Sequence, residues 1–278
     1  ELSFKIKYYY QMESNDLTVV IVTYRSENKI FSCLNSIPSE INIIVVENSN
    51  NQEFKKLIES KYNNVKCILA KENLGYARGN NVGLNQVKTK YALVLNPDAR
   101  LEKNCVNCFL NTAKKFQDFW LIGPANNQSD LNVNAEEFEV DNLKGFAIFF
   151  NIQKFNNNFF DENFFLYFEE IDLCKQVKMK KGKIILSKNI KINHEGSGSV
   201  DKNNENEFEK NRNWHWMWST YYYHKKYKGF LVALIIIIPK LISSIIKTFF
   251  YQLTFNISQR DIYFSRMSGI LNSVLGRK

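Results

Sequence analysis

Apolar and polar positions alternate in blocks along the first hundred residues. Thr18–Thr23 is a continuous β-branched run, and a second run of the same kind follows at Ile41–Val46. Such runs are typical of strands that are buried on both faces of a parallel sheet. Segments with helical periodicity lie after them, at Glu27–Ser36 and Gln52–Tyr62. Strand and helix in alternation predict an α/β fold with a doubly wound sheet.

The alternation continues to Leu95 and loosens beyond Asp98, where the order becomes α+β. Further elements are predicted as strand Val65–Leu69, helix Ala77–Val87, strand Tyr91–Leu95, helix Lys103–Phe116, short strands near Trp120–Ile122 and Gly145–Phe150, and strand Ile190–Asn193. From Asn211 onward strand signals vanish. We therefore expect an N-terminal extension of residues 1–16, a domain of residues 17–200 and a helical segment of residues 201–278.

The composition excludes a disordered chain, and the net positive charge is concentrated near the C-terminus. The chain has 278 residues, of which 45% are hydrophobic and 23% charged, and a net charge of +9. Twelve basic and four acidic residues follow residue 201, so almost all of the excess is C-terminal. The five cysteines are irregularly spaced, which does not indicate a secreted disulfide framework and favours a cytoplasmic location.

Candidate chemistry lies just after the predicted strands, because ligands of a doubly wound sheet bind at the carboxyl ends of its strands. Thr23, Tyr24 and Glu47 follow the first two strands. The third is followed by a glycine-containing segment that includes Asn73, Gly75, Arg78 and Asn80. Its glycines could let backbone N–H groups approach a phosphate, with Arg78 adding charge, or could simply form a turn. The dinucleotide fingerprint G-x-G-x-x-G is absent.

The fourth strand ends in Asn96-Pro97-Asp98. Asp98 would suit a hard cation that bridges diphosphate oxygens, or it would cap the next helix. His194 follows a predicted strand but has no metal-ligand spacing around it. Both residues therefore stay open on sequence grounds alone.

Three carboxylates, Glu169, Glu170 and Asp172, stand beside an aromatic run. On a helix Glu169 and Asp172 share a face, while Glu170 points about 100° away. A carboxylate among apolar side chains binds a proton more tightly, as a general base requires. The alternative is a solvated helix N-terminus enriched in acids, which suits Asp172 better than Glu170.

Taken in order, these segments resemble the family 2 inverting glycosyltransferases of the GT-A fold, in particular their bacterial rhamnosyltransferase-like branch. The resemblance covers residues 17–200. The strings that carry it are Thr18–Tyr24, Val45–Ser49, Glu72–Asn81, Leu95–Asp98, Phe160–Cys174 and His194. Each string alone is unspecific, but six of them in the family's order are specific.

The resemblance implies a GT-A mixed sheet that binds a nucleotide-diphospho-sugar across its strand ends. The donor-binding residues that it implies are Thr23, Tyr24, Glu47, Asn73, Gly75, Arg78, Asn80 and Asn96. Asn96 stands where the family's Asp-x-Asp motif has its first acid, and Asp98 takes the last position of that motif. His194 takes the position of the family's late metal-binding histidine, which implies Mg²⁺ or Mn²⁺. The family more often has aspartate at the positions of Glu47 and Glu170.

Glu170 falls on the family's catalytic base. The implied reaction moves a sugar with inversion to a hydroxyl of a bacterial cell-surface polysaccharide or a lipid-linked glycan. The alternative is a catalytically degenerate domain that acts as a membrane-bound binding or scaffolding subunit. The substitutions Glu47, Asn96 and Glu170 are its only support, and each keeps useful chemistry.

The apolar stretch Gly229–Phe255 is interrupted by Pro239, Lys240 and Lys247. After Pro239 it has the pattern of an amphipathic helix, and aromatic residues and lysines precede it, as at a lipid headgroup layer. We expect it to dock on the inner face of the cell membrane without crossing. Aromatic residues with lysines also stack on nucleobases, but the apolar run Ile235–Ile238 disfavours nucleic acid. A helix packed on the domain, or a homodimer seam, stays open.

Overall fold

The computed structural model describes residues 16–125, 128–194 and 205–278. These residues form two compact units. An α/β unit holds residues 16–162 and 170–194, and a helical unit holds residues 163–169 and 205–278. The expected extension of residues 1–16 and the expected boundary near residue 201 lie almost wholly outside the described residues.

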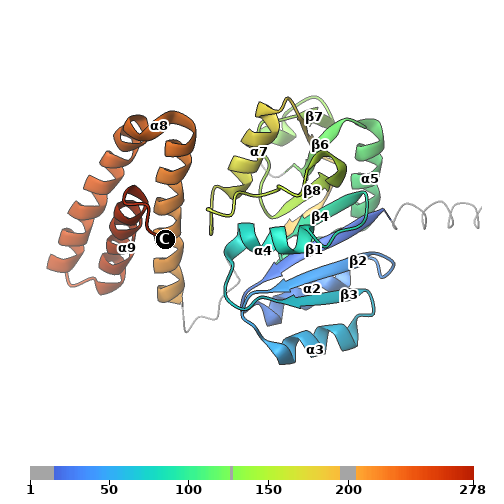
Figure 1. Ribbon diagram of the computed structural model, residues 1–278, viewed down its shortest axis with the longest axis horizontal. Helices are drawn as coiled ribbons and strands as arrows, with labels where there is room; N and C mark the ends of the chain where they lie inside the picture. Colours follow the sequence, from blue (N-terminus) through green and yellow to red (C-terminus); the bar gives the residue numbers. More distant parts are fainter. Residues whose placement is uncertain (1–15, 126–127, 195–204) are drawn as a thin grey trace, which may run out of the picture. The chain divides into compact units, whose positions relative to one another are not determined.

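The α/β unit is built on a mixed eight-stranded sheet with the order β3-β2-β1-β4-β8-β6-β9-β7 (Figure 1). Its strands are β1 Leu17–Thr23, β2 Asn42–Glu47, β3 Val65–Leu69, β4 Tyr91–Leu95, β6 Phe119–Pro124, β7 Glu137–Glu139, β8 Ala147–Asn151 and β9 Lys183–Ser187. The first four run parallel, whereas β8 is antiparallel to both of its neighbours, β4 and β6. The carboxyl ends of β1 to β4 therefore meet at one edge.

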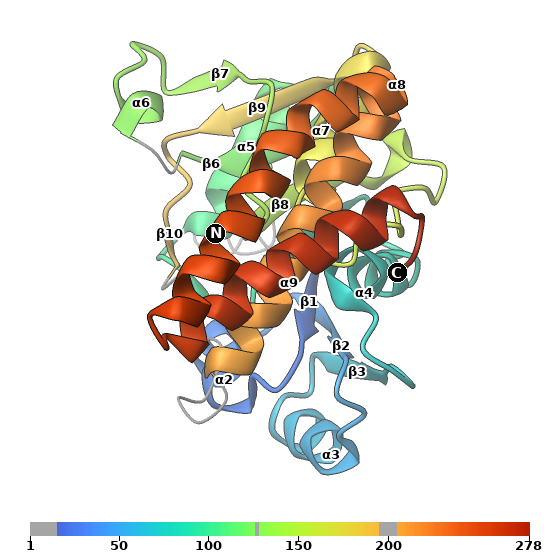
Figure 2. The same ribbon diagram turned by 90° about the vertical axis from the view of Figure 1, so that its left-hand side faces the viewer.

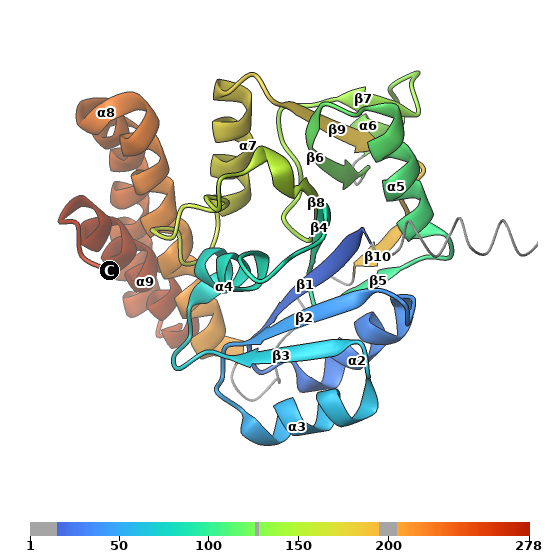
Figure 3. The same cartoon turned by 45° about the vertical axis from the view of Figure 1, so that its right-hand side comes forward.

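Helices cover both faces of this sheet (Figure 3). They are α2 Glu27–Ser36, α3 Gln52–Lys61, α4 Gly75–Leu84, α5 Cys105–Lys115, the short α6 Gln128–Leu131 and α7 Glu169–Met179, with a 3-10 turn at Ile152–Lys154. The helices α2, α3 and α5 bury Ile30, Phe54 and Phe109 in one core with Val19 and Ile43 of the sheet. Each such side chain contributes about 1.5–3 kcal/mol, so this core holds the strand ends in place.

On the opposite face α4 lies unusually close to the strands. A Cβ added to Gly79 would stand 2.9 Å from Val22 Cγ1, and one added to Gly83 would overlap Val20. These glycines are needed because helix and sheet approach too closely for a side chain. The close packing of helix on sheet therefore explains the spacing of these two glycines, a reason separate from the phosphate binding considered from the sequence.

A second, two-stranded sheet lies beside the strand ends. It joins β5, Ala99–Leu101, to β10, Ile192–His194, in antiparallel register with His194 opposite Ala99. The sequence pattern did not predict β5, because three residues are too few for a periodicity signal. This small sheet brings a residue from position 194 to the end of β4.

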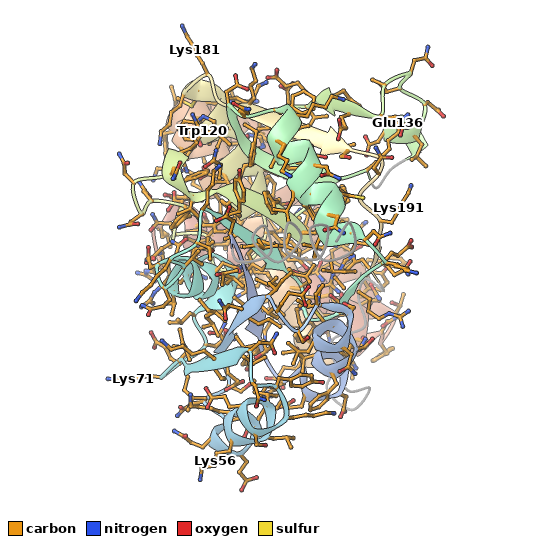
Figure 4. The ribbon with its side chains drawn as sticks, turned by 90° about the vertical axis from the view of Figure 1, so that its right-hand side faces the viewer. Lys56, Lys71, Trp120, Glu136, Lys181 and Lys191 are labelled. Atoms are coloured by element: carbon orange, nitrogen blue, oxygen red, sulfur yellow. The ribbon has the colours of Figure 1, made fainter. Side chains whose placement is uncertain are left out.

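The charged side chains of the α/β unit are spread over its surface. Figure 4 shows Lys56, Lys71, Lys181 and Lys191 extending outward at separate places. Several surface lysines pair with carboxylates, as Lys183 does with Asp118 at 2.8 Å. This distribution agrees with the near-neutral balance of this part of the sequence.

The helical unit consists of α8, Glu205–Leu253, and α9, Ile257–Val274 (Figure 2). Gly229 has φ 79° and ψ 170°, so it breaks α8 into two helices that fold back on each other. Met217 and Tyr221 of the first half pack with Ala233 and Ile237 of the second and with Ile270 of α9. The second half therefore begins near residue 230 and runs through Pro239, earlier than the sequence pattern predicted.

The second half of α8 leaves an apolar surface uncovered. We call the residues that form it the apolar ridge: Leu231, Ile235, Ile238, Ile242, Ile246, Phe249 and Leu253. They recur every three or four residues, so they share one helix face. Leu231 and Leu253 at its two ends are 72% and 78% exposed. By length and composition, the described residues contain one candidate membrane span, within Asn206–Leu253, and 17% of its apolar window is buried.

Candidate active site

The first two strand ends supply a buried polar pair. Thr23 ends β1 beside Glu47 of β2, and its carbonyl accepts a hydrogen bond of 2.8 Å from the Asn48 amide. The Thr23 hydroxyl is buried and has no hydrogen-bond partner among the residues that the structure describes. An unsatisfied hydroxyl in this position is costly for the fold and is available to a ligand.

Glu47 has a local partner that sequence reasoning did not foresee. Its side chain is 1% exposed, and its two oxygens accept backbone hydrogen bonds from Ser49 at 2.8 Å and Asn51 at 2.6 Å. Asn51 in turn caps α3 through the Phe54 amide. The carboxylate thus shapes the turn between β2 and α3, and any direct contact with a nucleoside stays a prediction.

Ser49 connects this turn to the one after β1. Its hydroxyl accepts a hydrogen bond of 3.0 Å from the Arg25 amide, and Arg25 adopts a left-handed φ of 50°. The Arg25 guanidinium lies 5.3 Å from the centre of the Tyr24 ring. Tyr24 is partly exposed at this edge, where an aromatic ring can stack on a flat ligand.

The glycine-containing segment begins with a local turn. The Asn73 side chain accepts a hydrogen bond of 3.0 Å from Gly75, and Gly75 has φ 70°, which favours glycine. Asn80 donates to the Tyr76 carbonyl at 2.9 Å, while its buried Oδ1 has no partner. Asn73 and Gly75 therefore build the start of α4, and Asn80 keeps a free acceptor.

Asn48 is a further residue that sequence reasoning did not single out. It donates to the Gly75 carbonyl at 3.1 Å, which ties the end of β2 to the start of α4. Its buried Oδ1 has no hydrogen-bond partner, like the Thr23 hydroxyl. Its place between Glu47 and Ser49 in the Val45–Ser49 string was the available signal.

Arg78 lies between two carboxylates. Its guanidinium is 3.5 Å from Glu72 and 3.7 Å from Glu162, and the side chain is 49% exposed. Its charge is thus partly compensated within the protein. A role as counter-charge for a leaving diphosphate would require the ligand to compete with these two acids.

Asp98 and His194 lie close together because β5 pairs with β10 in the small sheet. His194 Nε2 lies 3.3 Å from Asp98 Oδ1, and the imidazole stacks on Phe146 with ring centres 4.5 Å apart. Burial opposes ionisation of Asp98, but the hydrogen bond and charge of His194 outweigh it and hold the pKa of Asp98 below its ordinary value. Asp98 is therefore an anion at neutral pH.

This pair offers an oxygen ligand just before β5 and a nitrogen ligand at the end of β10, a donor set that suits Mn²⁺ or Mg²⁺ with water and phosphate as further ligands. Among the described residues, no cluster of three or more histidines, cysteines or acids surrounds it. Asn96 stands just before it, and its amide donates to the Phe146 carbonyl at 2.8 Å. The backbone of Asn96 thus fixes the loop that carries Asp98.

Glu170 lies in the first turn of α7, against Gly145 and Tyr76. A Cβ added to Gly145 would stand 3.6 Å from the Glu170 side chain and 3.7 Å from the Tyr76 hydroxyl. The Tyr76 hydroxyl donates to the Gly145 carbonyl. Burial raises the pKa of Glu170, against smaller opposing effects of backbone hydrogen bonds and Lys144. This carboxylate therefore binds a proton more readily than an ordinary glutamate does.

The other two acids differ from Glu170. Asp172 is fully buried and accepts a hydrogen bond of 2.5 Å from Gln176 one turn later in α7. Glu169 is buried at the first position of the helix, where the helix dipole favours an anion. Both side chains therefore help to form α7, and Glu170 stays the candidate base.

The sheet order, the flanking helices and the strand-end site define the GT-A fold, a class of α/β domains. Residues 18–173 match the Glycosyl transferase family 2 domain, which is more than half of the chain. The chain belongs to this family.

Two curated relatives agree with this assignment. The chain is 25% identical to the low-salt glycan biosynthesis hexosyltransferase Agl10 of Haloferax volcanii over 59% of this chain and 62% of the relative. It is 30% identical to a teichoic acid poly(glycerol phosphate) polymerase of Staphylococcus epidermidis over 34% of this chain and 14% of that one. The chain thus spans less than two thirds of either relative.

Solved structures support the fold. The mannosyltransferase PcManGT of Pyrobaculum calidifontis, in complex with GDP-Man and Mn²⁺, has a TM-score of 0.59 at 11% identity, covering 99% of this chain and 96% of that one. S. aureus TarS 1-349 has a TM-score of 0.52 at 15% identity, covering 94% and 92%. GalNAc-T7 with UDP, GalNAc and Mn²⁺ has a TM-score of 0.56 at 12% identity, covering 75% and 50%.

Proposed function

We propose that this chain is an inverting glycosyltransferase, of hexosyltransferase type and with rhamnose as one candidate sugar. It transfers the sugar from a nucleotide-diphospho-sugar to a hydroxyl of a cell-surface polysaccharide or a lipid-linked glycan. The observation that carries the proposal is Glu170, a partly buried side chain at the family's base position, where burial raises the pKa of the carboxyl. Family membership and relatives whose names include glycan and teichoic acid biosynthesis support it.

The reaction is a single displacement at the anomeric carbon. The acceptor oxygen forms the new bond as the bond to the diphosphate oxygen breaks, and Glu170 takes the proton of the attacking hydroxyl. The nucleoside diphosphate leaves with the electron pair of the broken bond. Because the acceptor enters opposite the leaving group, the configuration inverts and no second carboxylate nucleophile is needed.

The donor would be held by the strand-end residues. Within the described part of the chain, Thr23, Asn48 and Asn80 each keep a buried polar atom without a hydrogen-bond partner, which a nucleotide sugar would satisfy. Tyr24 offers a stacking surface, and Glu47 acts through the turn that it shapes. Asn73, Gly75 and Asn96 set the backbone around the site, and Arg78 lies at its margin.

Asp98 and His194 would hold a divalent cation, Mg²⁺ or Mn²⁺. When bound, the cation supplies positive charge to the departing diphosphate. The residues themselves contribute an ionised carboxylate and an imidazole held flat against Phe146. PcManGT and GalNAc-T7 have Mn²⁺ in their structures, which supports this cation.

The helical unit would dock on the inner face of the cell membrane as a peripheral anchor. Its apolar ridge would enter the acyl boundary, while the lysines near Gly229 and at residues 240 and 247 would contact anionic headgroups. Spanning is disfavoured because the second half of α8 packs against a charged first half through Tyr221 and Ala233. A docked enzyme would meet lipid-linked acceptors while taking soluble donors from the cytoplasm.

A panel of nucleotide sugars tests the proposal. The full chain, with Mn²⁺ or Mg²⁺ added, is screened by thermal shift, and each stabilising donor is then assayed for hydrolysis and transfer. We expect at least one donor to raise the melting temperature and to be turned over, with the product anomer opposite to that of the donor by NMR. Binding without turnover by any donor would instead favour the scaffolding subunit, and retention of configuration would exclude the single displacement.

A further inference from the structure

The segment that leads into α7 belongs to the helical unit. Residues 163–169 group with α8 and α9, and Glu170 follows directly in the chain. Four of the aromatic side chains of this segment each contact a ring on α8. The pairs are Phe164 with Tyr222, Phe165 with His215, Tyr167 with Trp216 and Phe168 with Tyr223, with ring centres 4.4–5.4 Å apart.

Two consecutive residues of this segment adopt an unfavourable backbone. Tyr167 has φ 69° and Phe168 has φ 70°, in the left-handed region that bulky residues rarely occupy. Such a conformation persists only where the surroundings hold it. Glu169, the first residue of α7, is all that separates Phe168 from Glu170.

Hydrogen bonds from α8 hold this backbone. Arg212 Nε donates to the Tyr167 hydroxyl at 2.6 Å, and Arg212 Nη1 donates to Glu209 at 2.7 Å. About two helical turns further on, the Ser219 hydroxyl donates to the Leu166 carbonyl at 2.9 Å. The Arg212 guanidinium is therefore held by Glu209 of the same helix and binds the side chain of Tyr167, the first left-handed residue.

We infer that Arg212, acting through Tyr167, is a positioning residue for Glu170 in the transfer reaction. The inference rests on the proposed role of Glu170 as base. Tyr167 and Phe168 are followed in the chain by Glu169 and Glu170, so a change in the backbone that α8 holds would be passed along the chain to the first turn of α7. If either left-handed residue relaxes, the start of α7 turns and the base moves away from the acceptor hydroxyl.

The test compares Tyr167→Phe and Arg212→Met with the unaltered full chain. Misplacing a catalytic group by about 1 Å costs up to about 10²-fold, so we expect kcat to fall roughly 10- to 100-fold in both variants. The donor KM and donor affinity by calorimetry should stay unchanged, because neither residue belongs to the donor site. The double variant should be no worse than the poorer single one, because both break the same bond.

Arg266→Met is the matched control. Arg266 makes a comparable hydrogen bond of 2.6 Å to Asn213 in the same unit, without contact to residues 163–169 among the hydrogen bonds of the described residues. Its kcat should stay normal. Equal loss in Arg266→Met, or a parallel rise in donor KM in the Arg212 and Tyr167 variants, would indicate general loosening and overturn the inference.

Glu170→Gln distinguishes the role of Glu170 as base from its positioning by Arg212 and Tyr167. If Glu170→Gln is inactive while Tyr167→Phe and Arg212→Met keep normal kcat, positioning by α8 is refuted and the base assignment stands. If Glu170→Gln keeps normal turnover, the proposed base is wrong and the inference falls with it. Tyr167→Phe removes a single oxygen atom, so the test holds even if Arg212→Met does not fold.

Discussion

At the scale of single residues, the site is marked by polar groups that the fold leaves unsatisfied or perturbed. The Thr23 hydroxyl and the side-chain oxygens of Asn48 and Asn80 are buried without partners. Glu170, which packs against Gly145, is a carboxyl with a pKa raised by burial. Groups of this kind lower stability, so their gathering at one sheet edge indicates use by a ligand.

Glu170→Gln should lower transfer by roughly 10²–10⁴-fold and leave donor affinity unchanged. It should also raise the melting temperature. The native pKa of Glu170 is above its unfolded value, so the native state binds the proton more tightly and loses stability as pH rises through this window. A neutral amide avoids that loss at neutral pH. Steady-state kinetics and thermal unfolding measure both effects, and near-normal turnover alongside an inactive Glu169→Gln would point to the other acid.

The pH profile of kcat should rise on its acid side with a pKa above that of an ordinary glutamate, because the base acts only when deprotonated and burial raises the pKa of Glu170. Turnover at saturating donor and acceptor is measured from pH about 4 to 8, a range that brackets the ordinary value of about 4.3. A profile that stays level down to that ordinary value would be incompatible with Glu170 as the base.

Removing the cation tests Asp98 directly. EDTA should abolish transfer, and Mn²⁺ should restore it, because Asp98 and His194 lie 3.3 Å apart and suit a shared ion. Asp98→Asn should weaken binding of Mn²⁺ with a nucleoside diphosphate in calorimetry. Asp118→Asn, which breaks a surface ion pair with Lys183, is the control and should bind normally. Full activity in EDTA would leave Arg78 as the main counter-charge.

At the scale of elements, α4 joins packing to the site. Gly79 and Gly83 bring the helix close to β1, and this approach lets Asn48 reach the Gly75 carbonyl. The helix is thus fixed to the sheet along its length. The asparagines at its start are held in place as a consequence.

Gly83→Ala should destabilise the protein by about 1–3 kcal/mol, because the added Cβ would overlap Val20 in a filled core. Chemical denaturation measures the change. Val20→Ala in the same chain should recover part of it, since the two sites share one space. Gly145→Ala is the control, because its Cβ would have ordinary contacts at 3.6 Å. Equal stability of Gly83→Ala and the unaltered chain would mean that α4 shifts freely on the sheet.

At the scale of the whole molecule, charge and exposed apolar surface are concentrated in the helical unit. The apolar ridge runs along the second half of α8, and twelve basic residues but only four acidic residues follow residue 201. Basic residues near an anionic surface contribute up to about 1 kcal/mol each, and a buried Leu, Ile or Phe about 1.5–3 kcal/mol. The two effects together favour a lipid surface.

Full-length protein should float with anionic liposomes at low salt and float less at high salt. The variant Ile246→Glu with Phe249→Glu should lose flotation and stay folded, because both side chains are exposed. Leu57→Glu, at an exposed apolar position of α3, is the control and should float normally. Protein that stays in the soluble fraction as a dimer, and becomes a monomer with the two glutamates, would identify the ridge as a homodimer seam.

The sequence by itself determined the elements whose pattern is local. The helix at Glu27–Ser36 and the strands at Val65–Leu69 and Tyr91–Leu95 were predicted with the bounds that the structure has. Continuous β-branched runs and helical periodicity are written in neighbouring residues, so no tertiary information is needed to recognise them. The family resemblance, and with it the GT-A fold, likewise rested on short strings in order and was confirmed.

Only the tertiary structure decided which distant residues meet. The pairing of β5 with β10 brings His194 to Asp98; a strand before His194 was predicted from the sequence, but β5 and its pairing with β10 were not. Three further features could not be predicted from the sequence: the backbone hydrogen bonds to Glu47 within its own turn, the two acids beside Arg78 and the turn at Gly229. Each of them depends on a backbone path or on a residue far along the chain. Contacts of this kind follow from how the elements pack, and packing sums many weak interactions that no short pattern records.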